Sequence, residues 1–218
     1  MDLTASDGFT LASYLARPAG APRGALVVIQ EIFGVNSHIR WVCDGYAADG
    51  YVAIAPALFD RVQRDVELGY DDADVARGRD IRGRVDTSQA LFDVDAARRA
   101  VASHGRVGVV GYCWGGYLSW MSACRIDGFA AAVVYYGGGI GGALAEKPRC
   151  PVMGHFGEHD AHIPMSDVDQ WRKRYPEHPV YTYDAAHGFN CDQRGSFDAT
   201  AARLARERSV EFFRRHVG

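Results

Sequence analysis

Short runs of branched and small apolar residues alternate along this chain with longer segments whose apolar residues have helical spacing. The runs occupy residues 26–29, 51–55, 107–110, 130–136, 152–156 and 180–183. The helical segments occupy residues 37–48, 86–103, 166–175 and 199–215. Runs of this kind are typical of strands that are buried on both faces, as in a parallel sheet. The alternation therefore predicts an α/β fold with a mainly parallel central sheet flanked by helices.

The length and composition fit one domain. A chain of 218 residues is within the range of a single α/β core, and 48% hydrophobic residues are enough to build that core. With 23% charged residues, the composition differs from that of disordered and fibrous chains. We predict a single domain over residues 1–218, with a short helical excursion over the top of the sheet in the polar stretch 61–84.

The charge balance excludes a general attraction to polyanions. The chain has 24 basic and 27 acidic residues, for a net charge of −3. Its first residues lack a basic segment followed by an apolar run, and no stretch reaches the roughly 18 consecutive apolar residues of a membrane span. We expect a cytoplasmic protein with no nucleic-acid and no membrane partner, present as a monomer or a small homo-oligomer.

The cysteines do not form a pattern of disulfides or metal ligands. They are Cys43, Cys113, Cys124, Cys150 and Cys191. Their odd number and wide spacing argue against a disulfide scaffold and against a zinc site. An alternative metal site at His155, His159 and His162 has a spacing that suits neither a sustained helix nor a two-histidine zincin motif. We therefore expect no metal and no cofactor.

One cysteine stands where a predicted strand meets a helical pattern. Residues 108–116 read Gly-Val-Val-Gly-Tyr-Cys-Trp-Gly-Gly, which has the form of a nucleophile elbow with cysteine in place of serine. Side chains at Gly111 and Gly115 would collide with neighbouring backbone in such a strained turn. The helix N-terminus at Cys113 favours a thiolate, and the next backbone N–H can face an oxyanion. Cys113 is thus the candidate nucleophile, and the alternative is an unreactive cysteine in a tight turn.

Candidates for the acid and the base follow the elbow. Asp160 and His187 each come after a predicted strand, and the order of nucleophile, acid and histidine is that of α/β-hydrolases. His159 and His162 flank Asp160 and are the serious rivals to His187.

Four segments together resemble a known family. They are residues 30–36 (Gln-Glu-Ile-Phe-Gly-Val-Asn), 111–116 (Gly-Tyr-Cys-Trp-Gly-Gly), 135–137 (Tyr-Tyr-Gly) and 186–189 (Ala-His-Gly-Phe). The chain resembles the dienelactone hydrolase family over nearly its whole length. The glutamate motif combined with a cysteine elbow is the specific part, since the elbow alone indicates only the broader α/β-hydrolase fold.

The resemblance implies a thiol-dependent carboxylic ester hydrolase that opens a lactone or ester through an acyl-enzyme. The implied substrate is a small molecule of the dienelactone (carboxymethylenebutenolide) type, with an anionic group left open, and the implied setting is the degradation of aromatic compounds. Two alternatives remain at this point. One is a general hydrolase of small esters or thioesters, and the other is a non-catalytic hydrolase-fold protein that binds a small ligand.

The resemblance also implies a triad of Cys113, His187 and Asp160, with Glu31 as an additional carboxylate beside the thiol. His187 can hold the proton of Cys113 and later pass it to the leaving group, while Asp160 stabilises the imidazolium. Glu31 is expected to hydrogen-bond the neutral thiol until an anionic substrate disturbs that contact. The alternative for Glu31 is a structural salt bridge.

The remaining implied residues bind the substrate and the oxyanion. The backbone N–H groups of Trp114 and Ile32 occupy the family's oxyanion-hole positions. An arginine that helps bind the substrate carboxylate follows the His-x-Phe motif of the family by two residues, and this chain has Cys191 there. A second arginine is expected from the segment that contains Arg77, Arg79 and Arg82. For substrate binding we predict Tyr135, Phe33, Arg79 and Arg194.

Overall fold

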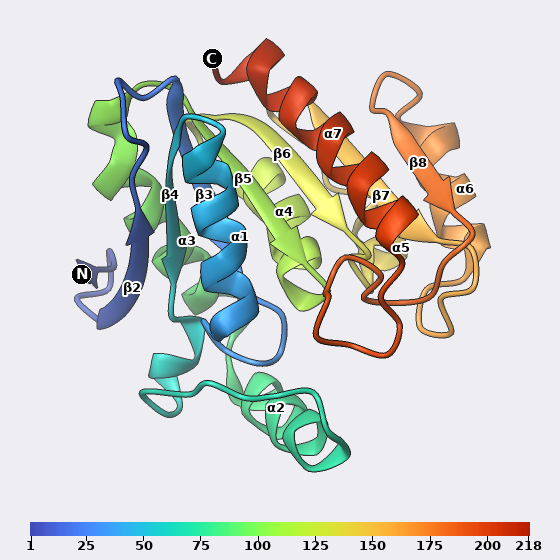
Figure 1. Ribbon diagram of the computed structural model, residues 1–218, viewed down its shortest axis with the longest axis horizontal. Helices are drawn as coiled ribbons and strands as arrows, with labels where there is room; N and C mark the ends of the chain where they lie inside the picture. Colours follow the sequence, from blue (N-terminus) through green and yellow to red (C-terminus); the bar gives the residue numbers. More distant parts are fainter.

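The computed structural model describes residues 1–218, and these build one eight-stranded sheet (Figure 1). The strands are β1 (Asp2–Thr4), β2 (Thr10–Ala16), β3 (Gly24–Ile29), β4 (Tyr51–Pro56), β5 (Val107–Tyr112), β6 (Phe129–Tyr135), β7 (Val152–Gly157) and β8 (Val180–Tyr183). Their order in the sheet is β1-β2-β4-β3-β5-β6-β7-β8. The six strands from β4 to β8 in this order run parallel, and every residue of β3, β4, β5 and β7 is buried. The predicted α/β fold with a mainly parallel sheet is confirmed.

The two N-terminal strands were not among the predicted ones. β2 pairs antiparallel with β4, and β1 pairs antiparallel with β2 at the edge of the sheet. Only Leu11 and Ala16 of β2 are buried, and the rest of the strand is partly or fully exposed. An edge strand of this kind mixes polar and apolar residues, so it lacks the continuous apolar run that marks the central strands.

Helices cover both faces of the sheet. They are α1 (Ser37–Ala48), α2 (Asp72–Arg84), α3 (Thr87–Val101), α4 (Trp114–Arg125), α5 (Ile140–Ala143), α6 (Met165–Arg174) and α7 (Ala199–His216), with 3-10 turns η1 (Leu58–Arg61) and η2 (Ala102–His104). α1 and α7 lie in front of the sheet and α3, α4 and α6 behind it (Figure 1). Asn36 caps α1 by accepting the N–H of Ile39, and Asp198 caps α7 in the same way. No helix combines the length and the apolar character needed to cross a lipid bilayer.

α2 is the excursion predicted in the polar stretch, and it is longer than expected. It lies apart from both helix layers, beyond the carboxyl ends of the parallel strands (Figure 1). Its only buried residues are Gly78 and Ile81. A Cβ on Gly78 would lie 2.1 Å from the carbonyl oxygen of Ile32, so the glycine lets α2 rest directly on the loop after β3. Ligands of open α/β sheets bind at this edge, so α2 is placed to form one wall of a site.

Two glycines of α2 give a matched test of this contact. We expect Gly78→Ala to destabilise the protein by about 1–3 kcal/mol, because its methyl group collides with the backbone of Ile32. A Cβ on Gly83 would have no neighbouring atom within 4 Å, so we expect Gly83→Ala to stabilise the protein by about 0.4–1 kcal/mol. Urea unfolding of both variants checks the pair. Equal stabilities would mean that α2 does not press on this loop.

Candidate active site

Cys113 lies in the turn between β5 and α4, in a strained backbone conformation. Its φ of 56° and ψ of −117° are rare for a residue with a side chain. A Cβ on Gly111 would lie 1.8 Å from the carbonyl oxygen of Gly115, and a Cβ on Gly115 would lie 2.4 Å from that of Ile29. The two glycines therefore allow the close approach of backbone that this turn requires.

The structure brings Cys113, His187 and Asp160 together from three loops. Nε2 of His187 lies 3.1 Å from Sγ of Cys113, and Nδ1 of His187 lies 2.7 Å from Oδ2 of Asp160. The other oxygen of Asp160 accepts the backbone N–H of His162 at 2.8 Å, which holds the carboxylate in place. Each loop follows the carboxyl end of a parallel strand, so three residues far apart in the sequence meet at one edge of the sheet.

The surroundings of His187 favour its protonated form. Burial lowers the pKa of the imidazole, but the hydrogen bonds to Asp160 and Cys113 and the charges of these groups outweigh burial and raise the pKa to about 10. The arrangement thus stabilises the state in which His187 holds the proton.

The rival histidines have other surroundings. His159 is exposed and its Nε2 lies 2.5 Å from Asp184. The ring of His162 meets that of His187 edge-on at a centroid distance of 5.3 Å, but it contacts neither the thiol nor the carboxylate of the triad through its side chain. His155 is buried in β7, where both ring nitrogens are hydrogen-bonded to hydroxyl groups. The three therefore do not converge on one point as metal ligands would.

Two residues beside the cavity have backbone N–H groups without a backbone acceptor. Trp114 is the first residue of α4, so its N–H has no acceptor within the helix. Ile32 lies in the loop after β3, and its N–H donates to no backbone carbonyl. Both residues line the same cavity as Cys113.

Glu31 is buried, and its carboxylate is held by partners other than the thiol. Oε1 lies 3.2 Å from Nη1 of Arg194, and Oε2 accepts the hydroxyl of Tyr70 at 3.3 Å. The expected hydrogen bond from Cys113 to Glu31 is not formed, because Sγ faces His187. The geometry corresponds to the alternative for Glu31, a salt bridge, since a guanidinium is a stronger partner for a buried carboxylate than a thiol is.

A cavity of about 490 Å³ opens over the thiol. It is lined by Ile32, Phe33, Val75, Arg79, Arg82, Cys113, Trp114, Gly138, Gly139, His162, His187 and Arg194. The predicted residues Arg79, Arg194 and Phe33 lie in this lining, as does Arg82, which was one of the open alternatives. Arg79 and Arg82 are three residues apart on α2 and so lie on one helix face. This spacing is the sequence feature that indicates that both can line the cavity. Arg77 does not line the cavity.

Contrary to the prediction, Tyr135 does not line the cavity. Its ring is fully buried, and its hydroxyl lies 2.8 Å from Oγ of Ser209 in α7. The next residue, Tyr136, has a φ of 37° just after β6, and its ring lies 5.1 Å from that of His187. Tyr136 is also fully buried and absent from the lining, so it contacts the ring of His187 from within the core, and neither tyrosine reaches the cavity.

The sequence has Cys191 in place of the family arginine and predicts Arg194 for substrate binding, and the structure shows where each lies. Cys191 is fully buried, whereas Arg194 reaches the cavity and pairs with Glu31. Tyr70, which supports the other oxygen of Glu31, lies in the irregular stretch before α2 and has no motif that would have identified it.

Comparisons with known proteins identify the family of this chain. A family model described as "Dienelactone hydrolase family" matches residues 11–217. A Synechocystis sp. protein named "Putative carboxymethylenebutenolidase" is 34% identical, covering 93% of this chain and 91% of its own length. The "Carboxymethylenebutenolidase" of Pseudomonas putida is 32% identical, covering 94% of this chain and 92% of its own.

A solved structure extends the similarity to three dimensions. The crystal structure of a "Putative Dienelactone Hydrolase" from Klebsiella pneumoniae superposes with a TM-score of 0.87 at 30% identity, covering 99% of this chain and 98% of that one. Sequence, fold and the order of strands and loops thus agree over almost the entire length, and on this basis the chain belongs to the dienelactone hydrolase family and is an ester hydrolase.

Proposed function

We propose that the chain opens a carboxylate-bearing lactone or ester of the carboxymethylenebutenolide type, with Cys113 as the nucleophile. The observation that carries the proposal is the chain of hydrogen bonds from Cys113 through His187 to Asp160, at the base of a cavity with three arginines. The cavity volume suits a small molecule, and its guanidinium groups suit an anion.

The first half of the reaction forms an acyl-enzyme. Sγ of Cys113 attacks the carbonyl carbon, and the thiol proton goes to Nε2 of His187. The developing oxyanion accepts hydrogen bonds from the N–H groups of Trp114 and Ile32. When the tetrahedral intermediate collapses, the bond from the acyl carbon to the ring or alkoxy oxygen breaks, and His187 gives its proton to that oxygen.

The second half hydrolyses the thioester. His187, now neutral, takes a proton from water, and the oxygen of that water attacks the acyl carbon. The bond to Sγ breaks, and the thiolate recovers the proton from His187 while the carboxylic acid leaves. Asp160 stays ionised and stabilises the imidazolium in both halves.

Arg194 gives the site a way to respond to substrate charge. In the absence of substrate its guanidinium pairs with Glu31, and this pairing reduces the conformational entropy of both side chains. A substrate carboxylate competes for the same guanidinium, so binding of an anion loosens Glu31 and leaves the thiol and His187 in place. A neutral ester has no carboxylate to compete for the guanidinium of Arg194, so its binding leaves the ion pair with Glu31 unchanged.

The test is selectivity for a carboxylated lactone over its methyl ester. We expect Arg194→Ala to lower kcat/KM for the carboxylated compound about 10- to 100-fold more than for the methyl ester, which is about 1.5–3 kcal/mol of charge-assisted hydrogen bonding. Arg79→Ala and Arg82→Ala should act in the same direction. Arg77→Ala is the matched control, because this exposed arginine of α2 lies outside the cavity.

An unchanged preference in all three cavity variants would point to the alternative, a general hydrolase of small neutral esters or thioesters. The other alternative, ligand binding without catalysis, falls away because the chain belongs to a family of ester hydrolases. The same substrate panel therefore separates the proposal from its remaining competitor.

We further propose that the protein acts in the cytoplasm as a monomer or small homo-oligomer on a small-molecule substrate, without nucleic-acid or membrane partners. All five cysteines are free, and thiols are kept reduced in the cytoplasm. A thiol nucleophile needs that environment, because oxidation of Cys113 would stop the reaction.

A further inference from the structure

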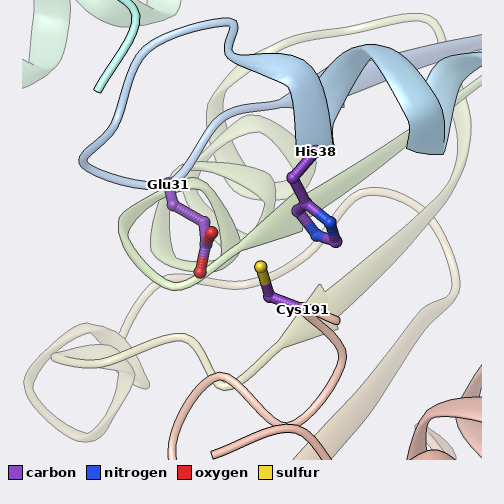
Figure 2. Close-up of side chains that lie close together, drawn as sticks. All are labelled: Glu31, His38 and Cys191. Atoms are coloured by element: carbon purple, nitrogen blue, oxygen red, sulfur yellow. The ribbon is translucent and has the colours of Figure 1, made fainter. Parts of the chain in front are cut away.

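Three buried potential metal ligands converge on one point, and the reaction described above uses only one of them. Glu31 comes from the loop after β3, His38 from the first turn of α1, and Cys191 from the loop after β8 (Figure 2). One ligand atom from each lies within 4.8 Å of the others, and the residues are at most 1% exposed. No other group of His, Cys, Asp and Glu in the chain has this geometry.

His38 is the member of this group that most needs an explanation. Both of its ring nitrogens are buried and neither has a hydrogen-bond partner. Apart from Glu31 and Cys191, its charged neighbour is Asp192, whose carboxylate lies 3.4 Å from Nδ1 without the geometry of a hydrogen bond. The other fully buried histidine, His155, has both nitrogens hydrogen-bonded. An unpaired buried imidazole costs free energy, so the contrast indicates that His38 meets a partner that the chain itself does not supply.

The donor set selects one class of partner. An imidazole nitrogen, a thiolate and one carboxylate oxygen suit Zn²⁺, whereas Mg²⁺ and Ca²⁺ prefer oxygen ligands only. Ligands 2.0–2.3 Å from zinc lie roughly 3.3–3.8 Å from each other in a tetrahedron, so the three side chains need to close by about 1 Å. Oε2 of Glu31 is the available oxygen, because its contact with Tyr70 is long while Oε1 pairs with Arg194.

We propose that Glu31, His38 and Cys191 form a binding site for Zn²⁺, with the fourth position taken by water. The Cys191 S–H bond breaks on binding and its proton passes to the solvent, so two anionic ligands balance the charge of the ion. Asp192 lies 3.4 Å from Nδ1 of His38, so a small rotation of the ring on metal binding lets Nδ1–H donate to this carboxylate and leaves Nε2 for the metal. This site is separate from the Cys113 and His187 pair, and its existence does not depend on the proposed substrate.

The experiment uses Co²⁺ as a spectroscopic substitute for Zn²⁺. The chelator-treated, reduced protein is titrated with Co²⁺ and the near-ultraviolet band of sulfur-to-cobalt charge transfer is recorded, followed by competition with Zn²⁺. We expect one equivalent to bind, and the band to be lost on addition of Zn²⁺. Cys113→Ala is the matched control, since it removes the catalytic thiol and should keep the band.

Substitutions at the site then locate the metal. We expect Cys191→Ser to lose the band and His38→Gln to weaken Co²⁺ binding at least 100-fold, with Asp192→Asn weakening it about 10- to 100-fold. Circular dichroism shows whether each variant is folded. In addition, Zn²⁺ should raise the Tm of the wild type and of Cys113→Ala but not that of Cys191→Ser, a difference that holds even if metal-free His38→Gln is unstable.

Two results would overturn the proposal. One is a cobalt band that disappears in Cys113→Ala and survives in Cys191→Ser, which would place the metal at the catalytic pair. The other is the absence of any band or Tm shift in the folded wild type at millimolar metal.

Discussion

Replacing Cys113 with alanine is expected to abolish ester hydrolysis while the protein stays folded. No other side chain at the elbow can form the acyl-enzyme, and we expect kcat to fall by about 10⁴-fold or more. The fold should persist because the thiol contacts only His187 through a hydrogen bond, and alanine adds no atoms to the turn. Steady-state hydrolysis of a lactone and of a p-nitrophenyl ester, with circular dichroism of the same samples, measures both parts.

Cys124→Ala is the matched control for this substitution. Cys124 is also in α4, but it is buried away from the cavity with its sulfur 3.7 Å from the carbonyl oxygen of Glu146. Its activity should equal that of the wild type. If Cys113→Ala loses only a few-fold in kcat, Cys113 is not the nucleophile. Cys113→Ser should keep a small activity, because the oxyanion hole survives and His187 can still deprotonate a hydroxyl.

His187→Ala should cost as much as the loss of the thiol. The two residues exchange one proton in every step, so their effects are not additive, and the double variant with Cys113→Ala should be no less active than either single one. Asp160→Asn should leave residual activity, because the imidazole keeps a partner but in a less favourable tautomer. The measurement is kcat/KM for each variant on one lactone.

His162→Ala serves as the control for His187. Its ring also lines the cavity and lies beside the ring of His187, yet it has no hydrogen bond to the thiol. We expect activity within a few-fold of the wild type. Inactivation by His162→Ala or His159→Ala together with tolerance of His187→Ala would show that the acid and base have been assigned to the wrong loops.

The parts of this protein that could be predicted from its sequence are those fixed by local rules. The central strands follow from continuous apolar runs, and the turn at Cys113 follows from glycines at the two positions where backbone atoms approach within about 2 Å of a would-be Cβ. The order of nucleophile, acid and histidine then places three side chains at one sheet edge. These inferences need only the order of the residues along the chain and the spacing of its apolar side chains.

The parts that could not be predicted depend on contacts between distant segments. Whether Tyr135 or Tyr136 turns toward His187 is decided by a change of φ after β6 that no residue type announces. The partners of Glu31 come from the stretch before α2 and from the loop after β8, so only the assembled fold reveals that Arg194 and Tyr70 hold the carboxylate. The proximity of His38 to Cys191 has the same origin.

Because α2 lies apart from the sheet, the residues that bind the substrate and the residues that react with it belong to two parts of the fold that can vary independently. The reacting groups belong to loops anchored in the buried sheet, where a change in one side chain is felt throughout the core. Arg79 and Arg82, in contrast, belong to a helix that touches the rest of the molecule mainly through Gly78 and Ile81. Substitution of the exposed residues of this helix can therefore change the substrate specificity while the catalytic residues stay intact. A lineage built on this plan can acquire new substrates by altering one peripheral helix, without having to evolve its chemistry again.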